Sequence, residues 1–236
     1  MIRNILFDLD DTLFDFRRAE REAVQKTLAC FNLPANEDVV RLYSEKNRQV
    51  WRLLEQGQIT RERLKVRRFE LLFEALGADM DPKEAAFYYE NTLAVGHYFM
   101  PGAKELLEKL WKQYRLYIVS NGTAHVQHGR IDGSGLLSYV RELFISEEIG
   151  YDKPDPAFFA SCFAKIPDFK KEETIIVGDS LTSDIKGGNQ AGIRAVWLNP
   201  EGVCNETDAH PDAEIRSLLE LEQWLETEKM RQNRKD

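Results

Sequence analysis

The sequence predicts an α/β fold: a doubly wound parallel sheet with an inserted all-helical segment. Two observations predict it. From about residue 100 onward, short apolar runs alternate with helical patterns, which is the order expected for a parallel sheet with helices on both faces. Between about residues 16 and 98 the chain shows helical pattern and no convincing strand, which indicates a helical insert after the first strand.

The expected strands are short apolar runs rich in Ile and Val, too short for helices and suited to burial on both faces. Five runs have this character, residues 4–9, 116–120, 143–146, 174–178 and 195–198, and a sixth strand is expected near 213–215.

Helix signals separate these strands. Residues 101–111 place apolar side chains at helical spacing. Asp155 and Pro156 form an N-cap followed by proline at the first helical position. Residues 217–220 read Ser-Leu-Leu-Glu, a capping box that predicts a final helix.

The insert carries its own start and stop signals. Asn36 and Thr60 are expected to cap two helices, Gly77 to end the second, and Pro82 to open a third that runs toward Tyr98. The aromatic side chains of the insert are expected in its apolar core: Trp51, Phe69, Phe73, Tyr88 and Tyr89.

This organisation predicts two domains. Residues 1–15 and 99–236 would form the α/β core, and residues 16–98 would form a helical cap. An insert directly after the first strand covers the carboxyl end of that strand, where open α/β sheets bind ligands. The cap is therefore expected to cover the functional site.

Composition narrows the range of partners. The chain has 236 residues and a formal net charge of -8, which argues against nucleic acid or an anionic membrane as the main partner. The three cysteines lie far apart without a CxxC pair, so neither a disulfide framework nor a zinc site is expected. Without a signal peptide or an apolar run of the ~20 residues that span a bilayer, a cytoplasmic protein is expected. Monomer and homodimer both remain open.

The first expected strand ends in three carboxylates, Asp8, Asp10 and Asp11. A buried charge is unfavourable unless it is paired or holds a metal. Asp8 and Asp10 lie two apart, so on an extended chain they point to the same side and repel each other. A hard divalent cation such as Mg²⁺, which prefers carboxylate oxygens, is the expected partner.

Polar clusters follow four of the expected strands. They are Asp8 to Thr12, then Ser120-Asn121-Gly122, then Lys153-Pro154, and finally Gly178-Asp179-Ser180 with Asp184 beyond it. The carboxyl ends of parallel strands meet at one edge of a sheet. The clusters together supply a candidate nucleophile, metal ligands, hydroxyl and amide donors and one cation, which are the groups that phosphoryl transfer requires.

These four clusters, in this order, resemble the four motifs of the haloacid dehalogenase-like hydrolase superfamily, which has a Rossmann-like core. The resemblance spans nearly the whole chain and includes a helical cap after the first motif. The sequence of residues 51–73, 120–122 and 178–185 is similar to that of the bacterial pyrimidine 5'-nucleotidase branch.

The resemblance implies the catalytic roles. Asp8 would attack phosphorus and form an aspartyl-phosphate. Asp10 would protonate the leaving oxygen and then deprotonate the hydrolytic water, and its main-chain carbonyl would bind Mg²⁺. Asp179 would complete the protein's share of the metal ligands, with Asp8 among them. Lys153 would neutralise the carboxylates and the incoming phosphate.

The resemblance also implies supporting roles. Asp184 and Ser180 would lie around the metal site, with Asp184 orienting either Lys153 or metal-bound waters. Nearby, His125 and His128 are expected at the surface. Contacts to the substrate would come from Thr12, Ser120, Asn121 and Gly122.

The expected function is a Mg²⁺-dependent phosphatase acting on a small phosphorylated metabolite, a nucleoside 5'-monophosphate foremost. A sugar-phosphate phosphatase, a phosphomutase and a 2-haloacid dehalogenase on the same core are the alternatives. Dehalogenating members of the superfamily lack an acid at the position of Asp10, because a halide needs no proton. A receiver-type phospho-acceptor domain is about half this length and lacks the insert. A degenerate binding protein is disfavoured because every catalytic position is filled.

Overall fold

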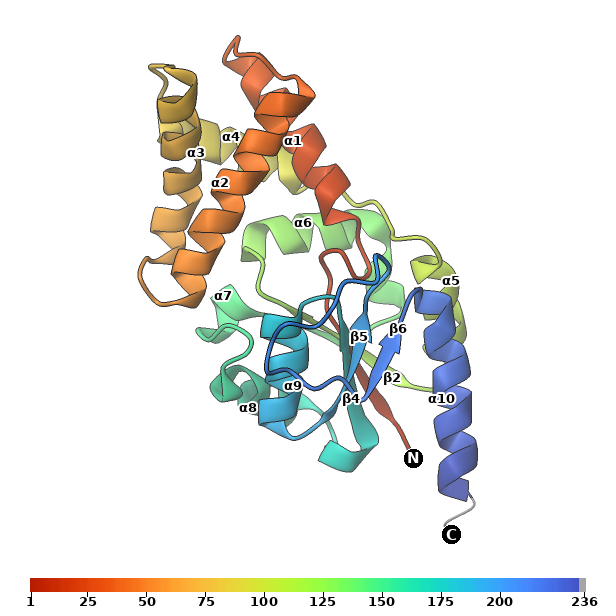
Figure 1. Cartoon of the computed structure of the whole chain (residues 1–236). Helices are drawn as coiled ribbons and strands as arrows, with labels where there is room; N and C mark the ends of the chain where they lie inside the picture. Colours follow the sequence, from red (N-terminus) through yellow and green to blue (C-terminus); the bar gives the residue numbers. More distant parts are fainter. Residues whose placement is uncertain (234–236) are drawn as a thin grey trace.

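The computed structural model describes residues 1–233. Its centre is a six-stranded sheet in the order β3-β2-β1-β4-β5-β6, and every neighbouring pair is parallel (Figure 1). The predicted doubly wound α/β fold is confirmed. The strands are β1 (Asn4–Phe7), β2 (Arg115–Ser120), β3 (Glu142–Ile145), β4 (Thr174–Gly178), β5 (Arg194–Leu198) and β6 (Ala213–Ile215).

Strand β1 lies at the point where the strand order reverses, between β2 and β4. Such switch points in open α/β sheets are where ligands bind, at the carboxyl ends of the strands. The first strand was expected to reach residue 9, but it ends at Phe7. The reason is a tight turn, in which the Leu9 carbonyl accepts hydrogen bonds from the amides of Leu13 and Phe14.

The two faces of the sheet are covered by different helices (Figure 1). Ile5 and Phe7 point to the face packed by α5 (Ala103–Leu110) and α10 (Leu218–Asn233). Leu6 points to the opposite face, packed by α8 (Pro156–Lys165) and α9 (Lys186–Ala191). The alternation follows from the two-residue period of a strand. The remaining helices and helical turns of this part are α6 (Ala124–Ser134), η1 (Leu136–Ser138), α7 (Ser146–Ile149), η2 (Lys171–Glu173) and η3 (Leu181–Ile185).

The insert consists of α1 (Phe16–Cys30), α2 (Glu37–Glu55), α3 (Arg61–Leu76) and α4 (Pro82–Leu93), packed around their own apolar cluster. The predicted caps are present. The side chain of Asn36 accepts from the amide of Val39, that of Thr60 accepts from the amide of Arg63, and Gly77 ends α3 at a φ of 63°. The third predicted helix is shorter than expected: it ends at Leu93 rather than near Tyr98.

Most of the aromatic side chains of the insert are buried as expected. Tyr43, Phe69 and Tyr89 pack with ring centroids 5.3 to 5.6 Å apart. The expectation is wrong for Trp51 and Tyr88. Trp51 lines a cavity on the side of α2 that faces the sheet. Tyr88 is 38% exposed and lies beside the exposed Phe87 on the outer face of α4.

The helical insert stands over the carboxyl edge of the sheet (Figure 1). Across the described part of the chain, no helix combines the length and the apolar character needed to cross a bilayer.

Candidate active site

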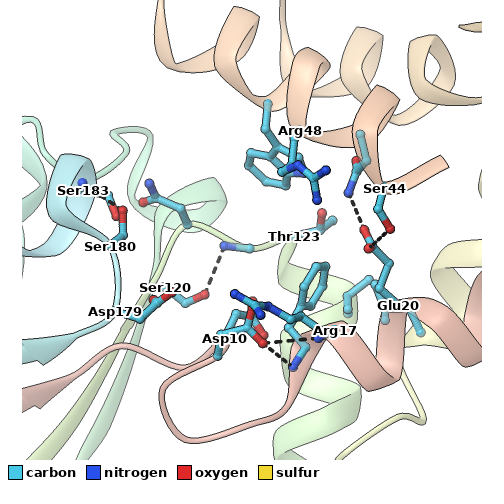
Figure 2. A pocket seen from close by; sticks show the side chains of 18 of the residues that line it. Asp10, Arg17, Glu20, Ser44, Arg48, Ser120, Thr123, Asp179, Ser180 and Ser183 are labelled. Atoms are coloured by element: carbon cyan, nitrogen blue, oxygen red, sulfur yellow. Dashed lines mark hydrogen bonds and ion pairs between the residues drawn. The ribbon is translucent and has the colours of Figure 1, made fainter. Parts of the chain in front are cut away.

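A cavity of about 940 Å³ lies between the carboxyl edge of the sheet and helices α1 and α2. Figure 2 shows Asp10, Ser120 and Asp179 at the edge of the sheet, with Ser44 and Arg48 facing them from the insert. The polar clusters that follow β1, β2 and β4, together with Lys153 after β3, all contribute to its walls. The cavity is far larger than a phosphate group requires.

Lys153 lies at the floor of the cavity and is 2% exposed. Its ammonium donates to Asp8 Oδ1 over 2.6 Å, to Asp184 Oδ1 over 2.7 Å and to the Val119 carbonyl over 2.8 Å. These three bonds use every N–H that a lysine ammonium has. Lys153 is therefore fixed in place and holds one oxygen of Asp8.

The backbone of Lys153 is positioned by Asn121. The Asn121 side chain donates to the Lys153 carbonyl over 2.8 Å and accepts from the Lys153 amide over 2.8 Å. The carbonyl of Asn121 accepts from Arg61 over 2.8 Å. The side chain of Asn121 is thus committed to Lys153, and its backbone N–H is the group left for the substrate contact that was expected of it.

The carboxylates around Lys153 exceed the positive charge available. Burial raises the pKa of Asp8 to about 7; Lys153 opposes this effect, and Asp184 and Asp10 add to it. Burial and the neighbouring carboxylates also raise the pKa of Asp179 well above its ordinary value. Burial opposes the charge of Lys153, but Asp184 and Asp8 outweigh it and raise its pKa. The site is short of positive charge.

Asp8, Asp179 and Asp184 each contribute one carboxylate oxygen to a cluster whose atoms lie within 4.8 Å of one another. Hard oxygen ligands with excess negative charge fit a divalent cation such as Mg²⁺. The sequence predicted Asp184 outside the metal ligands, and it predicted Asp10 as a ligand through its main-chain carbonyl rather than its side chain. In the structure the side chain of Asp184 joins this cluster while bonding Lys153, and the side chain of Asp10 bonds elsewhere.

Both carboxylate oxygens of Asp10 have partners on α6. Arg130 Nη1 is hydrogen-bonded to Oδ1, and Gln127 Nε2 donates to Oδ2 over 2.7 Å. Gln127 Nε2 also donates to Ser120 Oγ over 2.8 Å. The Asp10 side chain remains 28% exposed, so it is held in place but open to the cavity.

Ser120 and Gly122 line the cavity as expected. Ser120 Oγ accepts from the Gly122 amide over 3.0 Å and from Gln127, which leaves the hydroxyl proton for an oxygen in the cavity. Thr12 is fully buried and is not part of the cavity wall. Its predicted contact with substrate is therefore not supported, because the tight turn after Leu9 points it inward.

Asp184 is held by two opposed donors. Its Oδ1 accepts from Lys153, and its Oδ2 accepts from the Ser180 amide over 3.1 Å. The Ser180 side chain caps the turn that follows, accepting from the Ser183 amide over 3.2 Å. Of the two partners considered for Asp184, the structure places Lys153 against it.

Sequence reasoning missed Gln127 and Arg130, which lie three residues apart and therefore share one face of α6. On the same helix, His128 was expected at the surface, and it is about half exposed, beside Glu148. The signal available in the sequence is a glutamine and an arginine three residues apart, shortly after the Ser120-Asn121-Gly122 loop.

Arg61 was missed as well. It lies at the start of α3, yet its guanidinium binds the Asn121 carbonyl, the hydroxyl of Ser146 over 2.9 Å and the carboxylate of Asp152. It therefore joins the helical insert to two loops of the α/β core. No local pattern distinguishes it from the exposed arginines of the same helix.

Comparison with known proteins places the chain in a family. The profile described as haloacid dehalogenase-like hydrolase matches residues 5–198. YfnB of Bacillus subtilis is 39% identical over 226 residues, which are 96% of each chain. Its crystal structure bound to magnesium matches with a TM-score of 0.91, covering 95% of this chain and 98% of that one.

Two further relatives are named as pyrimidine 5'-nucleotidases. PynA of Streptococcus pneumoniae is 38% identical over 218 residues, which are 92% of each chain. YjjG of Escherichia coli is 31% identical over 227 residues, which are 94% of this chain and 96% of that one. The resemblance in the motifs is thereby confirmed, and the chain belongs to the family of haloacid dehalogenase-like hydrolases.

Proposed function

We propose that this protein is a Mg²⁺-dependent phosphatase that hydrolyses small phosphomonoesters, nucleoside 5'-monophosphates foremost, through an aspartyl-phosphate on Asp8. One observation carries the proposal. Asp8, held by Lys153, lines the same cavity as Asp10, which is held by Arg130. Such a pair supplies a nucleophile and a proton donor in fixed relation.

The reaction has two balanced steps. In the first, an oxygen of Asp8 bonds to phosphorus, the bond from phosphorus to the ester oxygen breaks, and the Asp10 carboxyl gives its proton to that oxygen. In the second, Asp10 takes a proton from water, the water oxygen bonds to phosphorus, and the bond to Asp8 breaks. Ser120 and the Asn121 amide would hold phosphoryl oxygens throughout.

Asp8 and Asp179 would hold Mg²⁺, together with Asp184 or the Asp10 carbonyl. The ion would supply charge neutralisation at the phosphoryl oxygens. Lys153 contributes in the same direction, because an unneutralised Asp8 is a poor nucleophile toward an anion.

Three observations favour a nucleotide as substrate. The cavity has room for more than a phosphate, Trp51 and Arg48 of α2 line it, and two relatives are named as pyrimidine 5'-nucleotidases. We assign residues 16–98 as a cap domain that selects the substrate. The carboxylate of Asp10 disfavours a dehalogenase, because a halide leaves without a proton.

A phosphate-release screen with Mg²⁺ tests the proposal. Nucleoside and deoxynucleoside 5'-monophosphates are compared with sugar phosphates, halide release is measured in parallel for haloacids, and EDTA is the control. Nucleotides are expected to turn over fastest, EDTA to stop the reaction and added Mg²⁺ to restore it. Faster turnover of sugar phosphates, halide release, or full activity in excess EDTA would each contradict a named part of the proposal.

A further inference from the structure

We propose that Arg130 and Gln127 are positioning residues that hold the Asp10 carboxyl in the orientation from which it exchanges its proton. The inference rests on the proposed function, because it takes Asp10 as the group that serves the leaving oxygen and the water. Neither residue belongs to the four motif clusters, and both lie on α6.

Arg130 is buried although its side chain is charged. Its side chain is fully buried, with the guanidinium over the rings of Phe14 at 5.2 Å and Phe16 at 5.7 Å. Removing a guanidinium from water is unfavourable unless its partners compensate, and an apolar side chain often serves stability as well or better. Asp10 is the carboxylate with which it pairs. A buried arginine here is better explained by what it does to Asp10 than by stability.

The guanidinium of Arg130 uses two of its three nitrogens for hydrogen bonds. Its Nε donates to the Gly96 carbonyl over 2.8 Å, and its Nη1 bonds Asp10 and, over 3.0 Å, Gln127 Oε1. Within the described residues its Nη2 is buried without a partner. Unpaired buried groups are rare in native proteins and concentrate where function demands them.

Gln127 completes the arrangement. One amide group spans Asp10 Oδ2 and Ser120 Oγ, so the proton donor and the hydroxyl expected to bind phosphoryl oxygen are joined through a single side chain. Each Asp10 oxygen accepts one bond and keeps a lone pair that can carry the transferred proton. The arrangement fixes orientation without blocking transfer.

Helix α6 is itself seated against the segment that returns from the insert to the core. A Cβ on Gly129 would come within 2.7 Å of the Ala94 carbonyl, so only glycine allows this approach. The bond from Arg130 to the Gly96 carbonyl lies on the same segment. Arg130 therefore fixes Asp10 relative to the connection that carries the insert.

The test uses a leaving group that needs no proton. In Arg130→Met, kcat/KM for a nucleoside 5'-monophosphate should fall by about 100-fold or more, the scale of general acid catalysis, whereas kcat/KM for 4-nitrophenyl phosphate should fall by less than about threefold. A burst of 4-nitrophenolate stoichiometric with enzyme should also appear, because the second step loses its base with either substrate. Gln127→Leu should show the same split more weakly.

The controls separate the inference from the proposed function. His128→Ala, on the exposed side of α6, should leave kcat/KM unchanged for both substrates. Asp10→Asn is the reference: if it lacks the split, the role proposed for Asp10 fails. If it shows the split while the Arg130 and Gln127 variants lower both substrates equally or neither, the inference is overturned. Should Arg130→Met fail to fold, Arg130→Lys, which keeps the charge but has one nitrogen in place of three, and Gln127→Leu decide the question.

Discussion

The Lys153 ammonium lies 2.6 Å from Asp8 Oδ1, although 145 residues separate the two in the chain. Because its other two N–H groups bind Asp184 and the Val119 carbonyl, it cannot swing away from Asp8 without losing three bonds. Among the described residues no hydrogen bond is made to Asp8 Oδ2. Lys153 thus orients the carboxylate through Oδ1 and leaves Oδ2 without a bond. The predictions for Asp8 and Lys153 start from this pair.

Replacing Asp8 with Asn should abolish turnover while leaving the fold intact. The amide keeps the shape of the side chain but cannot form the acyl-phosphate, so kcat should fall by more than about 10⁴-fold, the scale on which covalent nucleophiles are lost. Circular dichroism and the melting temperature in EDTA should match or exceed those of the wild type, because one buried charge is gone. Retained turnover would remove Asp8 from its assigned role.

Replacing Lys153 with Met should destabilise the metal-free protein. Asp8 and Asp184 would remain buried without their cation, and breaking a buried pair in this way costs about 3 kcal/mol. Urea unfolding in EDTA measures it. Lys165→Met is the matched control, because Lys165 is 58% exposed and 3.7 Å from Glu142, where little loss is expected. Equal losses in the two variants would show that the buried pairing is not what stabilises this site.

The stabilisation by Mg²⁺ should grow as the pH rises from 6 to 8. The pKa of Asp8 is raised from 3.8 to about 7 by burial, so between these values the folded metal-free protein holds a proton that the unfolded chain has released. Rising pH therefore lowers the free energy of unfolding in EDTA, and the loss is complete above about pH 7. Burial likewise raises the pKa of Asp11 to about 6, which acts in the same direction.

Melting temperatures with and without Mg²⁺ at the two pH values check this. A cation displaces the proton from Asp8, so its binding is weaker at pH 6 and the melting temperature should rise less there. Asp8→Asn should reduce the pH dependence in EDTA and leave the contribution of Asp11. A larger Mg²⁺ effect at pH 6 than at pH 8 would contradict the assignment of the raised pKa to this site.

The carboxyl edge of the sheet could be predicted from sequence because strand ends obey a simple geometry. Asp8, Lys153 and Asp179 follow different parallel strands, and such ends meet wherever the sheet is built. Helix starts such as Thr60 were equally local, because the cap is a bond to an amide three residues away. These signals need no knowledge of the three-dimensional packing.

Other features depend on packing that no local pattern encodes. The pairing of Arg130 with Asp10 spans 120 residues, and that of Arg61 with Asp152 spans 91. Each requires both the placement of a helix and the rotamer of a long side chain. Thr12 shows a related limit: it follows the same strand as Asp8, but the turn after Leu9 leaves its side chain fully buried and outside the cavity wall.

Replacing Arg61 with Ala should loosen the contact between α3 and the core. The side chain bonds the Asn121 carbonyl, the Ser146 hydroxyl and the Asp152 carboxylate, and hydrogen bonds of charged groups contribute about 1.5 to 3 kcal/mol. The free energy of unfolding should fall by about 2 kcal/mol, and small-angle scattering should show a larger radius of gyration.

Arg63→Ala serves as the control for Arg61. Arg63 lies on the same helix, about half exposed, and pairs with Glu70 within the insert rather than with the core. It should change neither quantity. If the two variants behave alike, the contacts of Arg61 with the core do not hold the insert in place.

Replacing Trp51 with Ala should weaken the binding of nucleotides and spare substrates that lack a base. Trp51 lines the cavity from α2, partly exposed, with the Arg61 guanidinium 5.6 Å from its ring centre. Stacking of a base on an aromatic ring contributes about 1–3 kcal/mol, so KM for nucleoside 5'-monophosphates should rise by about tenfold. KM for glycerol phosphate should change little, because that ester does not reach the ring. Trp111→Ala, at an exposed position just after α5, is the control in the same initial-rate assay. An equal rise in KM for both esters would place the effect of Trp51 on the phosphate rather than on the base. No rise for either would show that Trp51 does not take part in selecting the substrate.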